Sequence, residues 1–207
     1  MPSEVYKNIM VNLPFIKSNN TVKTIIAGEF FSSFSCDDIV IHTLVGSSVA
    51  VCLFDPESRV FGMNHFMLDM AKTESDDLEL ATRYGVHSME LLINDMLSRG
   101  AIKHNMQAKV FGGSSVLETI ANPNIGTLNS EFIKAFLDIE EIPLIASSLG
   151  SDSCRVIYMM PRTFTVHVRR VDGVGSGEFA KTAKSRWKKS IGEYNSVAKE
   201  KSELWVD

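Results

Sequence analysis

The chain lacks the features that would place it in a membrane, in an exported class or on nucleic acid. No apolar run reaches the roughly 20 residues that a helix needs to cross a bilayer, and the N-terminus lacks the basic, apolar and small-residue order of a secretory signal. Lysine and arginine number 21 and aspartate and glutamate 25, so the formal charge of −4 offers no attraction to nucleic acid or to an anionic membrane. We therefore expect a cytoplasmic protein with no nucleic-acid partner and no membrane insertion.

Cysteine is also scarce. The three cysteines, Cys36, Cys52 and Cys154, are too few and too scattered for a disulfide framework or a Cys-x-x-Cys metal site. Cys52 lies in an apolar run and is expected to be a small buried core residue. Clusters of Cys, His, Asp and Glu with the spacing of metal ligands are missing as well, so we expect no metal and no cofactor.

The apolar patterns of this 207-residue chain predict one domain that mixes strands and helices. Apolar and β-branched runs predict strands, and apolar residues spaced three or four apart predict helices. The expected strands cover residues 24–31, 39–44, 49–54, 60–68, 108–111, 142–146, 155–160 and 163–171, and the expected helices cover 80–97 and a segment beginning at 126–127. Strands before and after two helices, without regular alternation, predict an α+β fold.

Two segments fall outside this core pattern. Residues 1–22 show no convincing period and are interpreted as an N-terminal extension, with the domain itself covering residues 23–171. A glycine-rich turn follows, and then apolar residues at steps of three or four that predict a helix. Residues 172–207 are therefore expected to form a helical C-terminal extension that docks on its own domain or meets a partner or a membrane surface.

A corner of small residues followed by two apolar runs is the candidate functional site. Gly46-Ser47-Ser48 precedes the strand expected at 49–54, and the next expected strand contains the lone His65. If the two strands pair, Ser48 lies near His65, and a hydroxyl beside an imidazole is the minimal nucleophile and base. Taken alone, the same residues fit a tight turn and a core histidine. Gly112-Gly113 directly follows another strand and fits either a tight turn or an anion cradle.

Several blocks in this order resemble the CheD family, the chemoreceptor glutamine deamidases of chemotaxis. The blocks are TLVGSSVAVCLFDP (43–56), GMNHFML (62–68), TRYGVHSMELLIN (82–94), KVFGG (109–113), NIG (124–126) and IPL (142–144). The resemblance implies a layered α/β sandwich with a β-rich core flanked by helices, of the kind found in some toxin deamidases. It also implies chemoreceptor glutamines as substrates and a CheC-type phosphatase as a partner.

The resemblance assigns a role to three residues and shows one departure. The catalytic histidine of the family falls on His65 and its threonine on Thr43, whereas the nucleophilic cysteine position holds Ser48. The implied roles are nucleophile for position 48, general acid and base for His65, and orientation of the imidazole for Thr43. A hydroxyl is far less acidic than a thiol, so we expect the chain as written to be nearly inactive. Three explanations for Ser48 are open: an introduced substitution, a natural pseudoenzyme, or an enzyme that uses serine as its nucleophile.

Two other functions agree with the same sequence. One is a non-catalytic binding module that engages chemoreceptors or a CheC-type phosphatase through the same cleft. The other is a serine esterase or amidase that acts on small molecules.

Overall fold

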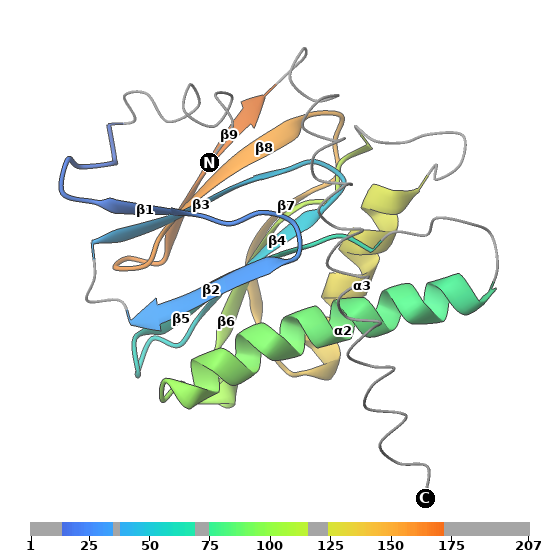
Figure 1. Cartoon of the computed structure of the whole chain (residues 1–207), viewed down its shortest axis with the longest axis horizontal. Helices are drawn as coiled ribbons and strands as arrows, with labels where there is room; N and C mark the ends of the chain where they lie inside the picture. Colours follow the sequence, from blue (N-terminus) through green and yellow to red (C-terminus); the bar gives the residue numbers. More distant parts are fainter. Residues whose placement is uncertain (1–13, 35–37, 69–74, 116–123, 172–207) are drawn as a thin grey trace, which may run out of the picture.

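The computed structural model describes residues 14–34, 38–68, 75–115 and 124–171, and its strands form two sheets (Figure 1). The four-stranded sheet has the order β1-β3-β8-β9 and the five-stranded sheet the order β2-β5-β4-β6-β7. The strands are β1 (Thr21–Thr24), β2 (Glu29–Phe34), β3 (Ile39–Val45), β4 (Val49–Phe54), β5 (Val60–Phe66), β6 (Gln107–Gly112), β7 (Leu144–Leu149), β8 (Cys154–Met160) and β9 (Thr165–Val171). The helices are α2 (Ser75–Ser98), the short 3-10 turn η1 (Lys103–Asn105) and α3 (Ile125–Ile139).

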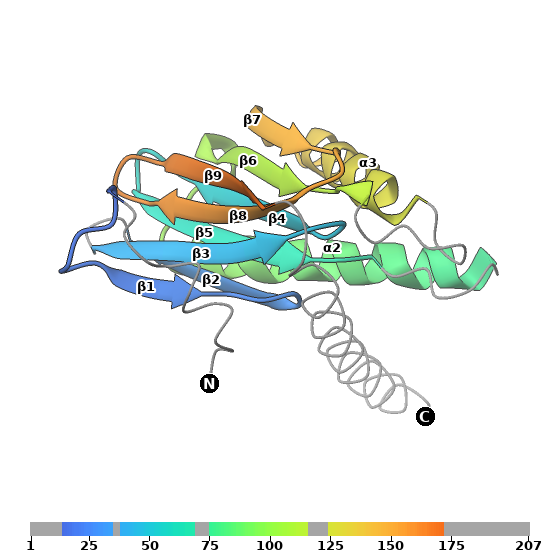
Figure 2. The same cartoon turned by 90° about the horizontal axis from the view of Figure 1, so that it is seen from above.

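The elements stack as three layers (Figure 2). One core lies between the sheets and joins residues such as Ile41 and Ile157 of the four-stranded sheet to Phe61 and Met63 of the other. A second core lies between the five-stranded sheet and the two long helices. The predicted α+β fold and its layered arrangement are therefore confirmed.

The central strand β4 faces a core on both sides. Val51 packs toward the helices, whereas Cys52 packs toward the other sheet, because successive side chains of a strand point in opposite directions. A strand buried on both faces is apolar at every position, which explains the unbroken sequence VAVCLF. Cys52 is fully buried, as predicted, and burial raises the pKa of its thiol far above the usual range.

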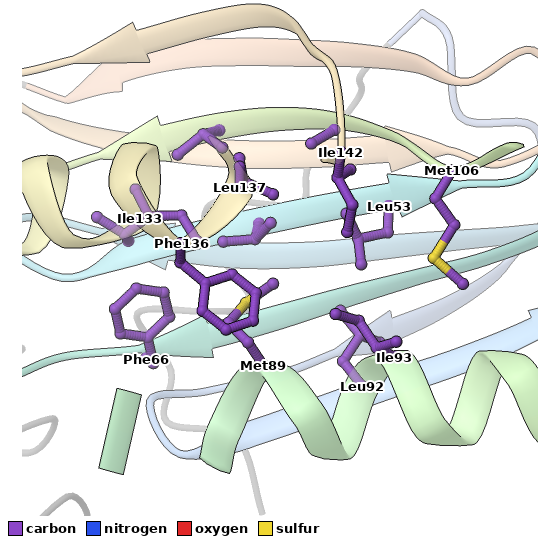
Figure 3. Packing of buried hydrophobic residues seen from close by; sticks show 14 of the residues in the cluster. Leu53, Phe66, Met89, Leu92, Ile93, Met106, Ile133, Phe136, Leu137 and Ile142 are labelled. Carbon is purple, nitrogen blue, oxygen red and sulfur yellow. The ribbon is translucent and has the colours of Figure 1, made fainter. Parts of the chain in front are cut away.

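The long helix α2 covers the five-stranded sheet with apolar residues spaced three or four apart. Met89, Leu92 and Ile93 point toward the sheet (Figure 3), and all three are buried. The helix begins at Ser75, before the predicted start at residue 80, and it ends at Ser98. Gly100 follows with φ of 95°, a left-handed conformation that glycine adopts at low cost.

The strand predicted at residues 24–31 is wrong. The chain forms β1 up to Thr24 and begins β2 at Glu29, and these strands belong to different sheets. Residues 25–28 cross between the sheets, where the N–H of Ile25 donates to the carbonyl of His42 and that of Gly28 to the carbonyl of His65. Ile25 and Ala27 of this segment are buried, so its apolar composition resembles that of a strand.

The structure describes only part of the two predicted extensions. Phe15 and Ile16 pack against the outer face of the four-stranded sheet, and β1 already begins at Thr21. Residues 172–207, with the predicted C-terminal helix, lie outside the described residues. The boundaries at residues 22 and 171 stay predictions. Neither long helix within the described ranges is apolar enough over sufficient length to span a membrane.

Candidate active site

The imidazole of His65 lies at the junction of the two sheets, where two hydroxyl groups contact it. His65 is in β5, Thr43 is in β3 of the opposite sheet, and Ser48 is in the corner between β3 and β4. His65 Nε2 lies 2.8 Å from Ser48 Oγ, and His65 Nδ1 lies 2.8 Å from Thr43 Oγ1. Ser48 is 6% exposed and His65 2%. The three residues that the sequence singled out are therefore in direct contact.

The strands explain why these side chains meet. Strands β4 and β5 pair antiparallel, as expected, with Ala50 opposite His65. His65 shares a face with Met63, which belongs to the core between the sheets, and Thr43 shares a face with Ile41 of that same core. The contact between Thr43 and His65 is thus a bridge from one sheet to the other.

The hydrogen bonds fix which nitrogen of His65 carries the proton. Thr43 Oγ1 lies 2.8 Å from the carbonyl oxygen of Ile25, which can only accept, so the single hydroxyl proton of Thr43 is donated there. Thr43 Oγ1 then accepts from Nδ1–H of His65. This leaves Nε2 with a free lone pair that accepts the proton of the Ser48 hydroxyl. The ring is held in the tautomer that a general base directed at position 48 requires.

Burial keeps this imidazole neutral. Removal from water lowers the pKa of His65 to about 3, because the charged ring loses hydration. Among the described residues, the partner of Nδ1 is the neutral hydroxyl of Thr43 rather than a carboxylate. When His65 takes a proton from position 48, the resulting imidazolium has no negative charge at Nδ1. In the Ser-His-Asp triad, an aspartate supplies that charge.

The Gly112-Gly113 pair packs directly against the serine corner. Both residues have positive φ, 119° for Gly112 and 63° for Gly113, which favours glycine. The N–H of Gly113 donates to the carbonyl of Ser48 at 2.9 Å. A Cβ atom on Gly112 would collide with that same carbonyl oxygen. The pair thus forms a tight turn that supports the corner.

Gly112→Ala is expected to lower the free energy of unfolding by about 2–3 kcal/mol, since it adds backbone strain and pushes the Ser48 carbonyl aside. Urea unfolding would measure the loss. Gly100→Ala is the matched control, because Gly100 also has positive φ but its added Cβ would meet no atom within 4 Å. Equal losses in the two variants would show that contact with the corner contributes nothing.

A buried amide that the sequence analysis missed completes the surroundings of the corner. Asn129 of α3 donates from Nδ2 to the carbonyl of Ser47 at 3.1 Å and accepts at Oδ1 from the N–H of Leu68 at 2.7 Å. The signal was present in the sequence, because Asn129 interrupts an apolar row of residues spaced four apart between Ile125 and Ile133. A polar residue on the core face of a helix requires a partner.

A metal ion in a protein needs a group of acidic, histidine or cysteine side chains to hold it. Within the described ranges, no three His, Cys, Asp or Glu side chains are grouped so that they could hold a metal ion. The fold and site therefore define an α/β sandwich in which a hydroxyl, a neutral imidazole and a second hydroxyl form one hydrogen-bonded chain across the junction of two sheets.

Comparison with known proteins identifies the family. The family model described as "CheD chemotactic sensory transduction" matches residues 67–170, a range that begins just after His65. The chain is 40% identical over 174 residues to "Probable chemoreceptor glutamine deamidase CheD 1" of Geobacter sulfurreducens, covering 81% of this chain and 86% of that relative. It is 42% identical over 165 residues to "Probable chemoreceptor glutamine deamidase CheD 2" of Shewanella oneidensis, covering 76% and 80%. The chain belongs to the CheD family, which confirms the resemblance.

Proposed function

We propose that this protein carries the site of a protein-glutamine deamidase whose substrates are glutamine side chains of chemoreceptors. The observation that supports the proposal is the hydrogen bond from Ser48 to an imidazole whose other nitrogen is tied to Thr43. In a member of the CheD family, that arrangement directs a general base at position 48. The low exposure of Ser48 suits a substrate that enters as a single extended side chain.

The reaction replaces the ammonia of the side-chain amide with water. The atom at position 48 attacks the amide carbon while Nε2 of His65 takes its proton, and the carbonyl oxygen becomes an oxyanion. Nε2–H then returns the proton to the leaving nitrogen, and ammonia departs. Finally, His65 removes a proton from water as the water attacks the acyl group, and it returns that proton to the atom at position 48 when the bond to this atom breaks and glutamate is released. Backbone N–H groups of the corner stabilise the oxyanion in both halves of the reaction.

Serine at the nucleophile position makes the chain as written a poor catalyst. A serine hydroxyl must lose its proton during the attack, and the buried His65 has only a neutral partner to offset the charge it gains. The expected resting function is engagement of chemoreceptors with very slow turnover. Family membership also supports a CheC-type phosphatase as a second partner.

The decisive experiment measures ammonia release from a cytoplasmic chemoreceptor fragment, with mass spectrometry to locate each glutamine converted to glutamate. The Ser48→Cys variant supplies the thiol, and the Ser48→Cys/His65→Ala variant removes the base. Conversion by the first and none by the second supports the deamidase. A folded Ser48→Cys protein that binds the fragment but releases no ammonia would instead establish a binding module.

Thr43→Val in the Ser48→Cys background is expected to slow ammonia release about 10- to 100-fold, because valine keeps the shape of threonine but leaves the Nδ1–H of His65 without an acceptor. Steady-state kinetics at pH 7 would measure the loss. Thr43→Ser retains the hydroxyl and should stay within a few-fold of the Thr43 protein. If the valine and serine variants turn over equally, Thr43 does not orient the ring.

A further inference from the structure

The buried side-chain amide of Asn129 joins the serine corner to helix α3 by a hydrogen bond. Its Nδ2 donates to the carbonyls of Ser47 at 3.1 Å and of Ile125 at 2.8 Å, and its Oδ1 accepts from the N–H of Leu68 at 2.7 Å. The Nδ2 group must face the two carbonyl oxygens and the Oδ1 atom must face the N–H of Leu68. Only one orientation of the amide satisfies all three contacts. Asn129 is fully buried.

The contact with Ser47 determines where the next N–H points. A trans peptide is planar, so the carbonyl of Ser47 and the N–H of Ser48 point in opposite directions. Because the carbonyl is directed at Asn129, the N–H of Ser48 is directed away from α3. The same reasoning applies one residue earlier, where the carbonyl of Gly46 accepts from the N–H of Ser114 at 2.8 Å and fixes the N–H of Ser47.

Within the described part of the chain, the N–H groups of Ser47 and Ser48 are open to a ligand. Among the residues that the structure describes, neither the N–H of Ser47 nor that of Ser48 has a hydrogen-bond acceptor. Buried backbone donors are nearly always paired, so two consecutive free donors beside a nucleophile position indicate a site for developing negative charge. The Ser48 side chain meanwhile remains bonded to His65.

We propose that Asn129 is a positioning residue that holds the Ser47–Ser48 peptide so that its N–H forms the oxyanion site of the reaction. The inference rests on the proposed acyl transfer at position 48. Asn129 does not touch the substrate; it acts through the peptide it binds. Its loss therefore weakens stabilisation of the oxyanion while the bond between position 48 and His65 stays intact.

Two reactions of the Ser48→Cys protein separate stabilisation of the oxyanion from activation of the nucleophile by His65. Attack on p-nitrophenyl acetate forms a thioester and expels p-nitrophenolate through a tetrahedral oxyanion. Alkylation by iodoacetamide forms a carbon–sulfur bond and expels iodide, with no charge developing on a carbonyl oxygen. Alkylation thus reports only the thiolate that His65 generates, and acylation reports the thiolate and the oxyanion site together.

Asn129→Ala and Asn129→Asp, each in the Ser48→Cys background, are expected to slow acylation about 10- to 100-fold and alkylation less than about threefold. The aspartate variant keeps an acceptor for Leu68 but turns a carboxylate oxygen toward the carbonyl of Ser47, so circular dichroism first establishes that each variant is folded. Ser130→Ala is the matched control, because Ser130 is the next buried residue of α3 and, among the described residues, its hydroxyl bonds to the carbonyl of Gly126 in its own helix.

Each outcome decides the inference. Equal losses in acylation and alkylation, or no loss of acylation in a folded variant, would overturn it. It also falls if Ser48→Cys is acylated no faster than Ser48→Ala. Because p-nitrophenyl acetate needs no receptor, a protein that is acylated but releases no ammonia would refute the proposed substrate while leaving the role of Asn129 intact.

Discussion

Ser48→Cys is expected to raise the rate of ammonia release from a chemoreceptor fragment by about 10³-fold, within the range that activation by a positioned base supplies. A thiol with a pKa near 8.5 yields a usable fraction of thiolate beside an imidazole, whereas a hydroxyl does not. The difference is large here because the buried His65 has a neutral hydroxyl, that of Thr43, at its far nitrogen to offset the charge it gains, so the more acidic nucleophile gives up its proton at much lower cost. Continuous ammonia detection at pH 7 to 8 would measure the gain.

The gain should need little change in structure. Sulfur replaces oxygen at one atom, and the carbonyl contacts that hold the corner do not involve the side chain of residue 48. Ser48→Ala sets the background rate, since it keeps the fold and lacks a nucleophile. If cysteine and serine forms release ammonia equally fast above that background, sulfur gives no advantage at this site and the reasoning from acidity is wrong.

The sequence predicted the local parts of the site better than its long-range parts. Strands β4 and β5 follow from two successive apolar runs, and their pairing brings His65 close to Ser48. Local patterns do not say which sheet a strand joins. They could not show that β3 and β4 separate into different sheets at the serine corner, because that depends on partners far along the chain.

The segment at residues 25–28 also shows that local sequence patterns do not reveal long-range contacts at the site. Its composition predicts a strand interior, yet its function is to supply the carbonyl of Ile25 that takes the proton of Thr43. That single acceptor sets the tautomer of His65, and it is a backbone group that no side-chain motif reveals. Asn129, by contrast, was visible as a polar residue in an apolar helical row. The side chains therefore allow the position of the site to be predicted from the sequence. The tautomer of His65 depends on a backbone carbonyl, which the sequence does not reveal.

Two buried histidines should make the fold sensitive to mild acid. Burial lowers the pKa of His65 to about 3, and burial together with the positive charge of Arg169 lowers that of His42 to about 4. In the unfolded chain both rings titrate near 6.5. As the pH falls below 6.5, the unfolded state binds protons that the folded state excludes, so stability is lost with decreasing pH. From pH 7 to pH 4.5 each ring should cost about 2.5 kcal/mol, about 5 kcal/mol together.

Urea unfolding at several pH values between 7.5 and 4.5 would measure this slope, and His42→Gln should reduce it by about half. The free energies of unfolding of the variant and the parent are compared at each pH. The cost of packing glutamine is the same at every pH, whereas the contribution from protonation of His42 is absent from the variant. The two curves should therefore converge as the pH falls. Parallel curves would mean that His42 takes up its proton in the folded protein as readily as in the unfolded chain, and that its burial beside the ring of Tyr158 does not keep it neutral.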